Sequence, residues 1–314
     1  MISEFKKIYI TGGTGLVGRN IRENVTIMQS KILTPSHSEL DLLDYNKVYE
    51  FIKSEKPDLI IHTAGLVGGI VANMADPYGF FTQNAVMGIN LVRASKELGI
   101  KNFLNLSSSC FYPCGAVNPL KEDVILTGAF EKTNEGYGLA KASILKMCEY
   151  VTEQFDGFNY KTLIPCNLYG RYDKFSLQKS HLIPAIIRKV ADAKANGDKS
   201  IEIWGDGESR REFMYAGDFA QIVPQILEKF DEIPSVMNIG LGHDYTINEY
   251  YQMIAKVIGV EVEFTHDLTK PSGMRQKLLD ISKQKEFGFE SRFSLEEGIR
   301  KTYEYYVNEY KGED

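Results

Sequence analysis

Short runs of apolar residues alternate with longer amphipathic segments through the first half of the chain. The runs that are typical of buried β-strands lie at 7–11, 31–34, 58–63, 102–106 and 160–164. Segments long enough for helices lie between them, at 46–54, 78–98 and 135–155. Because strands that alternate with helices pair in parallel, the pattern predicts an α/β fold with a Rossmann-type, doubly wound parallel sheet.

The alternation becomes less regular after residue 170. A polar loop leads to a helix expected from His181 and to a short strand that runs into Trp204. Further helices are expected at 216–230, 246–258 and 294–310, and a further strand at 236–239. Since no repeat or linker interrupts the chain, we predict two interleaved parts. These are a Rossmann domain of residues 1–170 plus 213–240 and a smaller α/β lobe of residues 171–212 plus 241–314.

Composition restricts the class of partner. The chain has 314 residues, of which 43% are hydrophobic and 25% charged, and a net charge of −6. A general nucleic-acid-binding protein would present a basic surface, so we expect no nucleic-acid partner. A few well-placed Arg and Lys side chains can still bind a small anionic ligand.

Targeting and redox signals are also informative. No apolar run approaches the roughly 20 residues that span a bilayer, and the first residues lack the apolar core of a signal peptide. The four cysteines form neither a disulfide framework nor a zinc pattern. We therefore expect a soluble, cytoplasmic protein with reduced thiols, no membrane partner and no metal.

A glycine-rich loop follows the first expected strand. Its glycines recur at every third position and precede a helix, which is the context that gives such a spacing meaning. Glycine permits a tight turn and the close approach of a pyrophosphate, which rests on the helix N-terminus. A plain strand–helix turn is the alternative, and a P-loop is excluded because no Gly-Lys-Ser/Thr follows. The residues expected at a dinucleotide here are Gly12, Thr14, Gly15, Leu16, Val17 and Gly18.

Tyr137 and Lys141 are four residues apart, so on a helix they share one face. A phenol has a pKa of about 10, and a nearby ammonium favours the phenolate. Ser108 could hold the reacting oxygen while the Tyr137 proton moves. Together the three groups predict a proton-transfer site suited to interconverting an alcohol and a ketone.

The segment after the second strand bears on the choice of dinucleotide. An NAD enzyme usually has an acidic residue here to bind the ribose hydroxyls. This chain has Ser36, His37 and Ser38, and no acid before Glu39. The segment therefore favours NADP, with these three side chains near the 2′-phosphate. We expect Asp41 and Leu42 near the adenine, with a solvated turn and a core leucine as the alternative, and Ala64, Gly65 and Leu106 also along the cofactor.

With the glycine loop, Ser108 and the Tyr137/Lys141 pair in this order, the chain resembles the extended short-chain dehydrogenase/reductase superfamily. Further segments resemble the GDP-L-fucose synthase family, whose members are epimerase–reductases of GDP-4-keto-6-deoxymannose. These segments lie at 62–73, 108–113, 133–141, 165–170, 180–185, 204–207, 211–213 and 277–280. The resemblance covers nearly the whole chain.

The resemblance implies a role for each catalytic residue. Ser108 and Tyr137 would bind the C4 keto oxygen, and Tyr137 would protonate it as NADPH delivers hydride. Lys141 would lower the pKa of Tyr137 and hold the nicotinamide ribose. Cys110 and His181 match the family's pair for proton exchange at C3 and C5, where the ketone acidifies the hydrogens. A thiol with a pKa near 8.5 and an imidazole near 6.5 suit this task.

The resemblance also implies a binding surface and an assembly. The backbone at Pro165, Asn167 and Leu168 would lie along the nicotinamide. The residues that match the family's GDP-sugar site are Lys189, Trp204, Arg211 and Lys277. By analogy the partners are a GDP-linked 4-keto sugar and a second copy of the chain in a homodimer. The alternatives are structural: Cys110 as an apolar filler, His181 as a helix-terminal residue and Trp204 as core.

Some positions depart from the family pattern. Gly136 and Gly138 flank Tyr137 where Pro and Ala are usual, and Arg171 and Lys174 replace Pro and Asn in a loop expected near the sugar. A GDP-4-keto-heptose reductase without epimerase activity is therefore an alternative function. A 4,6-dehydratase is disfavoured because no acids stand near Ser108, and an NAD-dependent 4-epimerase because no acid directly follows the second strand. A non-catalytic dinucleotide-sensing protein is disfavoured because Tyr137 and Lys141 are both present.

Overall fold

A parallel sheet of six strands forms the larger part of the protein. The computed structural model describes residues 5–25, 29–176, 180–270 and 274–310. The strand order is β10 (Val236–Ile239), β5 (Asn159–Pro165), β4 (Asn102–Leu106), β3 (Leu59–His62), β1 (Lys7–Thr11) and β2 (Lys31–Leu33). All five neighbouring pairs are parallel, so the strand ends that precede the helices lie along one edge.

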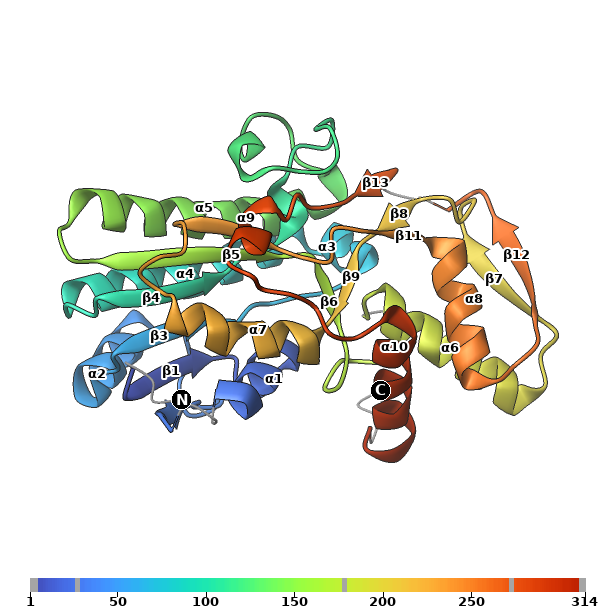
Figure 1. Ribbon diagram of the computed structural model, residues 1–314, viewed down its shortest axis with the longest axis horizontal. Helices are drawn as coiled ribbons and strands as arrows, with labels where there is room; N and C mark the ends of the chain where they lie inside the picture. Colours follow the sequence, from blue (N-terminus) through green and yellow to red (C-terminus); the bar gives the residue numbers. More distant parts are fainter. Residues whose placement is uncertain (1–4, 26–28, 177–179, 271–273, 311–314) are drawn as a thin grey trace.

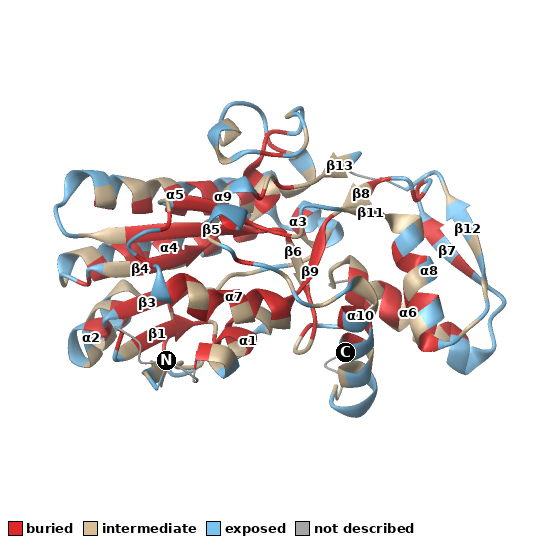
Figure 2. Cartoon of the chain, viewed as in Figure 1, coloured by how far each residue is buried: buried red, intermediate tan, exposed pale blue. Residues whose placement is uncertain are grey.

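Helices cover both faces of this sheet because its strands are apolar on both sides. Along β1, Ile8 and Ile10 join one core cluster and Tyr9 joins another, as the two-residue period of a strand requires. The helices that contribute to the first cluster include α1 (Leu16–Val25) and α7 (Ala216–Glu228). The second is covered by α2 (Tyr45–Glu55), α4 (Pro77–Glu97) and α5 (Glu135–Gln154). Figure 2 shows the buried strands inside this layer of helices.

A smaller group of elements occupies the other half of the molecule in Figure 1. They are α6 (Leu182–Asn196), β7 (Ser200–Trp204), α8 (Ile247–Ile258), β12 (Glu263–Asp267) and α10 (Leu295–Asn308). Their core cluster includes Ile187, Ile254 and Ile299, each fully buried. Both α8 and α10 begin with a capping box, in which the side chain and backbone of one residue are reciprocally bonded to a Glu three positions later.

Two small sheets lie between the halves (Figure 1). One contains β11 (Tyr245–Thr246), β8 (Arg210–Arg211) and β13 (Gln276–Lys277), and the other β6 (Asn167–Tyr169) and β9 (Phe213–Tyr215). Between β8 and β9, the fully buried carboxylate of Glu212 accepts hydrogen bonds from the backbone N–H groups of Leu241, Gly242 and Leu279. Burial raises the pKa of Glu212 to about 7 despite these bonds. One side chain thus joins three segments far apart in sequence.

The predicted fold class is confirmed, and most predicted elements differ from the observed ones by one or two residues at their ends. The strand predicted at 236–239 is reproduced by β10. Two short helices were not predicted, α3 (Ile70–Ala75) and α9 (Ser282–Glu286). Because α3 follows the glycine pair Gly68 and Gly69 and spans only 6 residues, its sequence resembles a loop. The predicted division into two domains stays a prediction.

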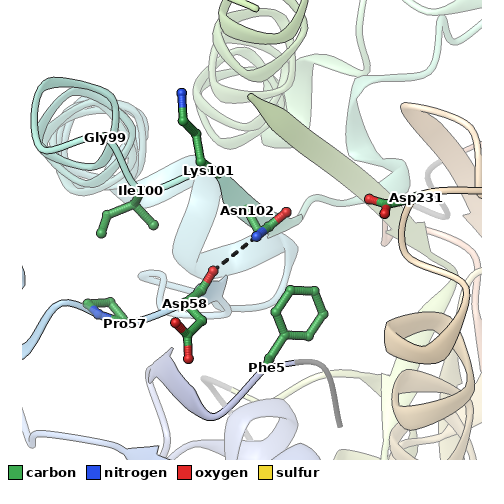
Figure 3. A pocket seen from close by; sticks show the side chains of 8 residues that line it. All are labelled: Phe5, Pro57, Asp58, Gly99, Ile100, Lys101, Asn102 and Asp231. Atoms are coloured by element: carbon green, nitrogen blue, oxygen red, sulfur yellow. Dashed lines mark hydrogen bonds between the residues drawn. The ribbon is translucent and has the colours of Figure 1, made fainter. Parts of the chain in front are cut away.

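A cavity of about 330 Å³ opens at the amino edge of the large sheet. Figure 3 shows its lining, where the Asn102 amide donates to the backbone oxygen of Asp58. In addition, the Asp58 carboxylate accepts from the Lys7 N–H, and Asn159 donates to Asp231. This cavity lies at the opposite edge from the glycine loop. Among the helices in the described ranges, none is both long and apolar enough to span a membrane.

Candidate active site

The sequence-predicted site residues converge at the carboxyl edge of the large sheet. The glycine loop follows β1, Ala64 and Gly65 follow β3, Ser108 follows β4, and Asn167 follows β5. In open parallel sheets this edge is where ligands bind, because the loops there surround a crevice.

The glycine loop is shaped by close backbone contacts. Gly12 has a φ of +64°, and a Cβ there would lie 2.8 Å from the Cα of Ala64. A Cβ on Gly18 would lie 2.3 Å from the carbonyl oxygen of Gly12, so the first turn of α1 presses on the loop. Gly15 differs, since its Cβ would meet nothing closer than 3.5 Å. Packing within the protein therefore does not require glycine there, whereas the approach of a pyrophosphate to the α1 N-terminus would.

Hydrogen bonds fix the floor of this crevice. The hydroxyl of Thr11 lies 2.9 Å from Nδ1 of His62 and accepts from the backbone N–H groups of Thr63 and Ala64, each at 3.1 Å. Burial, and then the charge of Lys141, lowers the pKa of His62 to about 3. His62 is therefore a neutral structural residue, and Thr11 is a supporting residue that the sequence alone did not single out.

The segment after β2 is exposed and self-bonded. Glu39 accepts hydrogen bonds from both the backbone N–H and the hydroxyl of Ser36, each at 2.7 Å. The ring of His37 is 84% exposed, with Nδ1 lying 3.8 Å from the carboxylate of Asp41. Ser36 and Ser38 are hydrogen-bonded to each other at 3.0 Å. Hydroxyl and imidazole groups therefore surround this turn together with two carboxylates, those of Glu39 and Asp41.

Ser108, Cys110 and Tyr137 meet where β4 ends and α5 begins. Ser108 caps a short 3₁₀ turn, Ser109–Phe111, and its hydroxyl accepts from the N–H of Cys110 at 3.3 Å. Burial raises the pKa of Tyr137 above its ordinary value, the thiol of Cys110 raises it further, and the hydrogen bond to Ser108 lowers it. Burial thus outweighs the hydrogen bond to Ser108 in the net pKa of Tyr137, and the predicted lowering by Lys141 stays a prediction. At neutral pH Tyr137 holds its proton.

Lys141 lies one turn along α5 on the Tyr137 side, as the four-residue spacing predicts. Its Nζ is 5.9 Å from the centre of the Tyr137 ring and donates to the carbonyl oxygen of Leu106 at 3.0 Å. A Cβ on Gly65 would lie 3.9 Å from the same Nζ. Burial lowers the pKa of Lys141 to about 8, with the thiol of Cys110 acting in the opposite direction. The ammonium form still predominates at neutral pH.

The two glycines that flank Tyr137 have a packing reason. A Cβ on Gly136 would lie 2.5 Å from the backbone oxygen of Pro77, and one on Gly138 would lie 3.0 Å from that of Cys110. The start of α5 is therefore held between the start of α4 and the Cys110 turn. The departure from the family's Pro and Ala allows this close approach and does not merely loosen the helix.

Asn134 is a site residue that sequence reasoning missed. Its amide Nδ2 lies 3.2 Å from the sulfur of Cys110, and its buried Oδ1 has no hydrogen-bond partner among the described residues. Its position immediately before the Tyr137 helix was the available signal. Burial lowers the pKa of Arg211, and the charges of Glu131, Asp244 and Cys110 oppose this shift, so its guanidinium lies among these groups.

His181 approaches from the smaller half of the molecule as the N-cap residue of α6. Its neighbour Ser180 donates from its hydroxyl to the carbonyl oxygen of Lys174 at 2.6 Å, and a Cβ on Gly69 would lie 3.0 Å from the Ser180 oxygen. Burial, and then the charge of Lys174, lowers the pKa of His181. The imidazole is therefore neutral near pH 7 and able to accept a proton.

The side chain of Arg171 lies against α1, and the expected place of its loop near the sugar stays a prediction. Its guanidinium approaches Glu23 of α1 at 3.7 Å and contacts the ring and hydroxyl of Tyr172. Tyr172 in turn donates to Glu23 at 2.6 Å and packs under Arg19. Opposite charge on α1 thus directs Arg171 to the outer surface, while Lys174 stays beside His181.

The predicted sugar-nucleotide residues form two groups. Arg211 and Lys277 are register partners on neighbouring strands β8 and β13, so they project from one face. The ammonium of Lys189 lies 5.8 Å from the ring of Trp204 and donates to the carbonyl oxygen of Glu202 at 3.2 Å. Trp204 is 46% exposed, which contradicts its alternative assignment as core. On the nicotinamide side, Asn167 donates to the carbonyl oxygen of Glu212 at 3.0 Å, and Pro165 ends β5 while Leu168 lies in β6.

Comparison with known proteins identifies the family. Residues 8–240 match the model of the NAD dependent epimerase/dehydratase family. The chain belongs to that family. It is 49% identical over 303 residues to the GDP-L-colitose synthase of Yersinia pseudotuberculosis, covering 96% of this chain and 98% of that protein. It is also 49% identical to the GDP-L-fucose synthase of Azorhizobium caulinodans, covering 96% of each.

A solved structure supports the same placement within the NAD dependent epimerase/dehydratase family. The GDP-mannoheptose C4 reductase from Campylobacter jejuni with NADP bound is 32% identical, with a TM-score of 0.86 over 96% of this chain and 98% of that one. The resemblance to the GDP-L-fucose synthases drawn from the sequence is thereby confirmed.

Proposed function

We propose that this protein is an NADPH-dependent reductase of the C4 ketone of a GDP-4-keto-6-deoxy sugar, and that it also exchanges the protons at C3 and C5. The main observation behind this proposal is that Ser108, Tyr137 and Cys110 lie together at the carboxyl edge of the sheet, with Lys141 one turn further along α5. Family relatives that are a GDP-L-fucose synthase, a GDP-L-colitose synthase and an NADP-bound GDP-mannoheptose C4 reductase support this chemistry.

The glycine loop and the ends of β3, β4 and β5 are the surface for NADP. Gly15 leaves room at the α1 N-terminus for a pyrophosphate, and the ammonium of Lys141 has further donors for a ribose hydroxyl after its bond to Leu106. His37, with Ser36 and Ser38, faces the solvent where a 2′-phosphate would lie. When bound, NADPH supplies the hydride for C4.

Tyr137 donates the proton that the C4 oxygen needs as it becomes a hydroxyl. Its raised pKa keeps the phenol protonated, and its hydrogen bond to Ser108 places two hydroxyl groups where one carbonyl oxygen can accept from both. The positive charge of Lys141 stabilises the phenolate that remains after transfer.

Cys110 and His181 move the protons on the carbons next to the ketone. One group removes a proton from carbon, the electrons of the C–H bond pass into the enolate of the C4 carbonyl, and the other group returns a proton to the opposite face. The neutral imidazole of His181 suits proton acceptance, and the thiol of Cys110 can return a proton and become a thiolate.

The GDP moiety occupies the smaller half of the molecule. Arg211 and Lys277 project from one face of neighbouring strands and suit the diphosphate, because both present fixed positive charge. Trp204, half exposed and close to Lys189, offers a ring surface for stacking.

A GDP-4-keto-heptose is the second candidate substrate. The observation that favours it is the likeness to a GDP-mannoheptose C4 reductase, together with the orientation of Arg171 toward α1 rather than into the site. A reductase of that kind would keep Ser108, Tyr137 and Lys141 and need no epimerase activity.

A homodimer formed by α4 and α5 is the proposed assembly. These neighbouring helices carry large apolar side chains whose exposure to water is unfavourable. They are Tyr78, Phe81, Ile89, Leu139 and Tyr150. A second copy with the same surface would cover them. The four free thiols suit the reducing conditions of the cytoplasm.

Two assays test the proposal. NADPH absorbance should fall when the protein is given GDP-4-keto-6-deoxymannose, and Tyr137→Phe should slow this about 1000-fold with NADPH binding unchanged, because the proton donor is lost. No oxidation of NADPH, with bound cofactor confirmed, would contradict the proposal for that sugar, and the same assay with a GDP-4-keto-heptose decides between the two substrates. In deuterated water without NADPH, the absence of deuterium at C3 and C5 would contradict the roles of Cys110 and His181.

A further inference from the structure

The contact between Asn134 and Cys110 is the feature that the proposed chemistry has not yet used. Nδ2 of Asn134 lies 3.2 Å from the sulfur, which is within hydrogen-bonding distance for a sulfur acceptor. Asn134 is the N-cap residue of α5, yet its side chain makes no capping hydrogen bond to that helix. The amide is therefore directed at the thiol and not at the helix backbone.

The other edge of the same amide is unusual. Its Oδ1 is buried and has no hydrogen-bond partner among the described residues. A buried amide oxygen without a partner is costly, because it has lost water and gained nothing in return. The unpaired Oδ1 of Asn134 is therefore available to accept a hydrogen bond from a hydroxyl group of a bound ligand.

The backbone around this contact is closely packed. Gly138, in the first turn of α5, leaves space for the carbonyl oxygen of Cys110, and Gly136 does the same for the carbonyl oxygen of Pro77. The short helix α3 packs against the turn that contains Asn134. The backbone segments that carry Asn134 and Cys110 are thus held close together.

We propose that Asn134 is a positioning residue for Cys110, whose amide N–H orients the sulfur and stabilises the thiolate through which Cys110 passes during proton exchange. A thiolate accepts a hydrogen bond more strongly than a thiol, so a fixed N–H donor raises the fraction of thiolate at a given pH. The proposal rests on the proposed function for its biological meaning. The thiol chemistry itself can be measured without substrate.

The direct test is the pH dependence of Cys110 alkylation by iodoacetamide, followed by mass spectrometry on the full-length protein. Only the thiolate reacts, and Cys110 is partly exposed. In Asn134→Ala the alkylation of Cys110 at neutral pH should become about tenfold slower, because the N–H donor to the sulfur is lost. Cys114, exposed in the same chain, serves as an internal reference and should not change.

Two further variants keep the test decisive. Asn134→Asp retains the shape of the side chain but presents only acceptors, so Cys110 should be alkylated more slowly still. Thr133→Ala, a change in the same turn, should leave the profile where it was. If Asn134→Ala does not fold, as judged by its thermal unfolding, the Asp variant decides. A Cys110 profile that coincides with that of the unchanged protein, or moves to lower pH, overturns the proposal.

A second readout connects the contact to turnover. Deuterium exchange into the substrate without NADPH should fall about tenfold in Asn134→Ala, while NADPH binding stays the same. If the unchanged protein shows no exchange at all, the proposed epimerisation has failed. The alkylation profiles still decide the role of Asn134 in that case.

Discussion

Two buried lysines lie at opposite ends of the large sheet. Lys141 is 6% exposed and donates to the carbonyl oxygen of Leu106, whereas Lys161 on β5 is 8% exposed and donates to that of Ile233 at 2.7 Å. Burial lowers the pKa of both. The carboxylate of Asp231 opposes the lowering of the Lys161 pKa, and Cys110 opposes that of Lys141.

The difference teaches how to recognise the functional end of the sheet. Near Lys161 the amide of Asn159 donates to the carboxylate of Asp231, which also lines the cavity of Figure 3. Around Lys141 the neighbours are a thiol, a protonated phenol and, at Asn134, an amide oxygen without a partner. The two lysines therefore differ in the chemistry of their neighbours, and Lys141 is the one that lies among groups able to move a proton.

Replacing each lysine with methionine tests most directly whether the two edges of the sheet differ in function. Lys141→Met should slow C4 reduction about 100-fold, because the charge that stabilises the Tyr137 phenolate is lost. Lys161→Met should leave NADPH oxidation within about twofold, since that lysine faces the other edge. Steady-state kinetics on the two variants measures this, and equal losses would contradict the assignment of the two ends.

The same Lys141→Met variant should be more stable at neutral pH. Burial lowers the pKa of Lys141 from 10.5 to about 8, so below about pH 8 the folded protein carries a buried charge at full cost. Its removal should raise the free energy of unfolding by about 1–2 kcal/mol, after the loss of the bond to Leu106. Between about pH 8 and 10.5 the unfolded chain binds more protons than the folded protein, so the unchanged protein becomes more stable as pH rises. The difference in free energy of unfolding between it and Lys141→Met therefore shrinks over this range. Urea unfolding across this range checks the sign.

A smaller effect is expected where α5 meets α4. Gly136→Ala should lower the free energy of unfolding by about 1–3 kcal/mol, because the new Cβ would lie 2.5 Å from the Pro77 oxygen. This exceeds the gain of roughly 0.5–1 kcal/mol in helix propensity. Gly115→Ala, where a Cβ meets nothing within 4 Å, is the control. A Gly136→Ala protein with a higher melting temperature would show that the two helices separate easily.

The smallest effect is expected at the end of β2. The Glu39 carboxylate, held by Ser36, carries a charge of the same sign as a 2′-phosphate bound at this turn and would repel it. Glu39→Gln should therefore lower the KM for NADPH about two- to fivefold and leave that for NADH unchanged. Glu50→Gln, on the exposed side of α2, is the matched control. Equal changes with both cofactors would place the 2′-phosphate elsewhere.

Much of the site follows from local patterns. The three-residue spacing of Gly12, Gly15 and Gly18 predicts the turn that α1 requires, and the four-residue spacing of Tyr137 and Lys141 places both on one face of α5. These predictions succeed because turns and helices depend on near neighbours in sequence. The contact of Arg171 with Glu23 was not predicted, because Glu23 lies on α1 and no local pattern connects the two.

The sequence by itself determined the alternation of strands and helices, the residues able to move a proton, and the loop that admits a dinucleotide. Only the tertiary structure decided how those residues behave. The pKa of Tyr137 rises because burial, a property of the surrounding segments, exceeds the effect of its hydrogen bond to Ser108. The contact of Asn134 with Cys110 likewise arises because α5 packs against the turn after β4, at an approach set by two glycines.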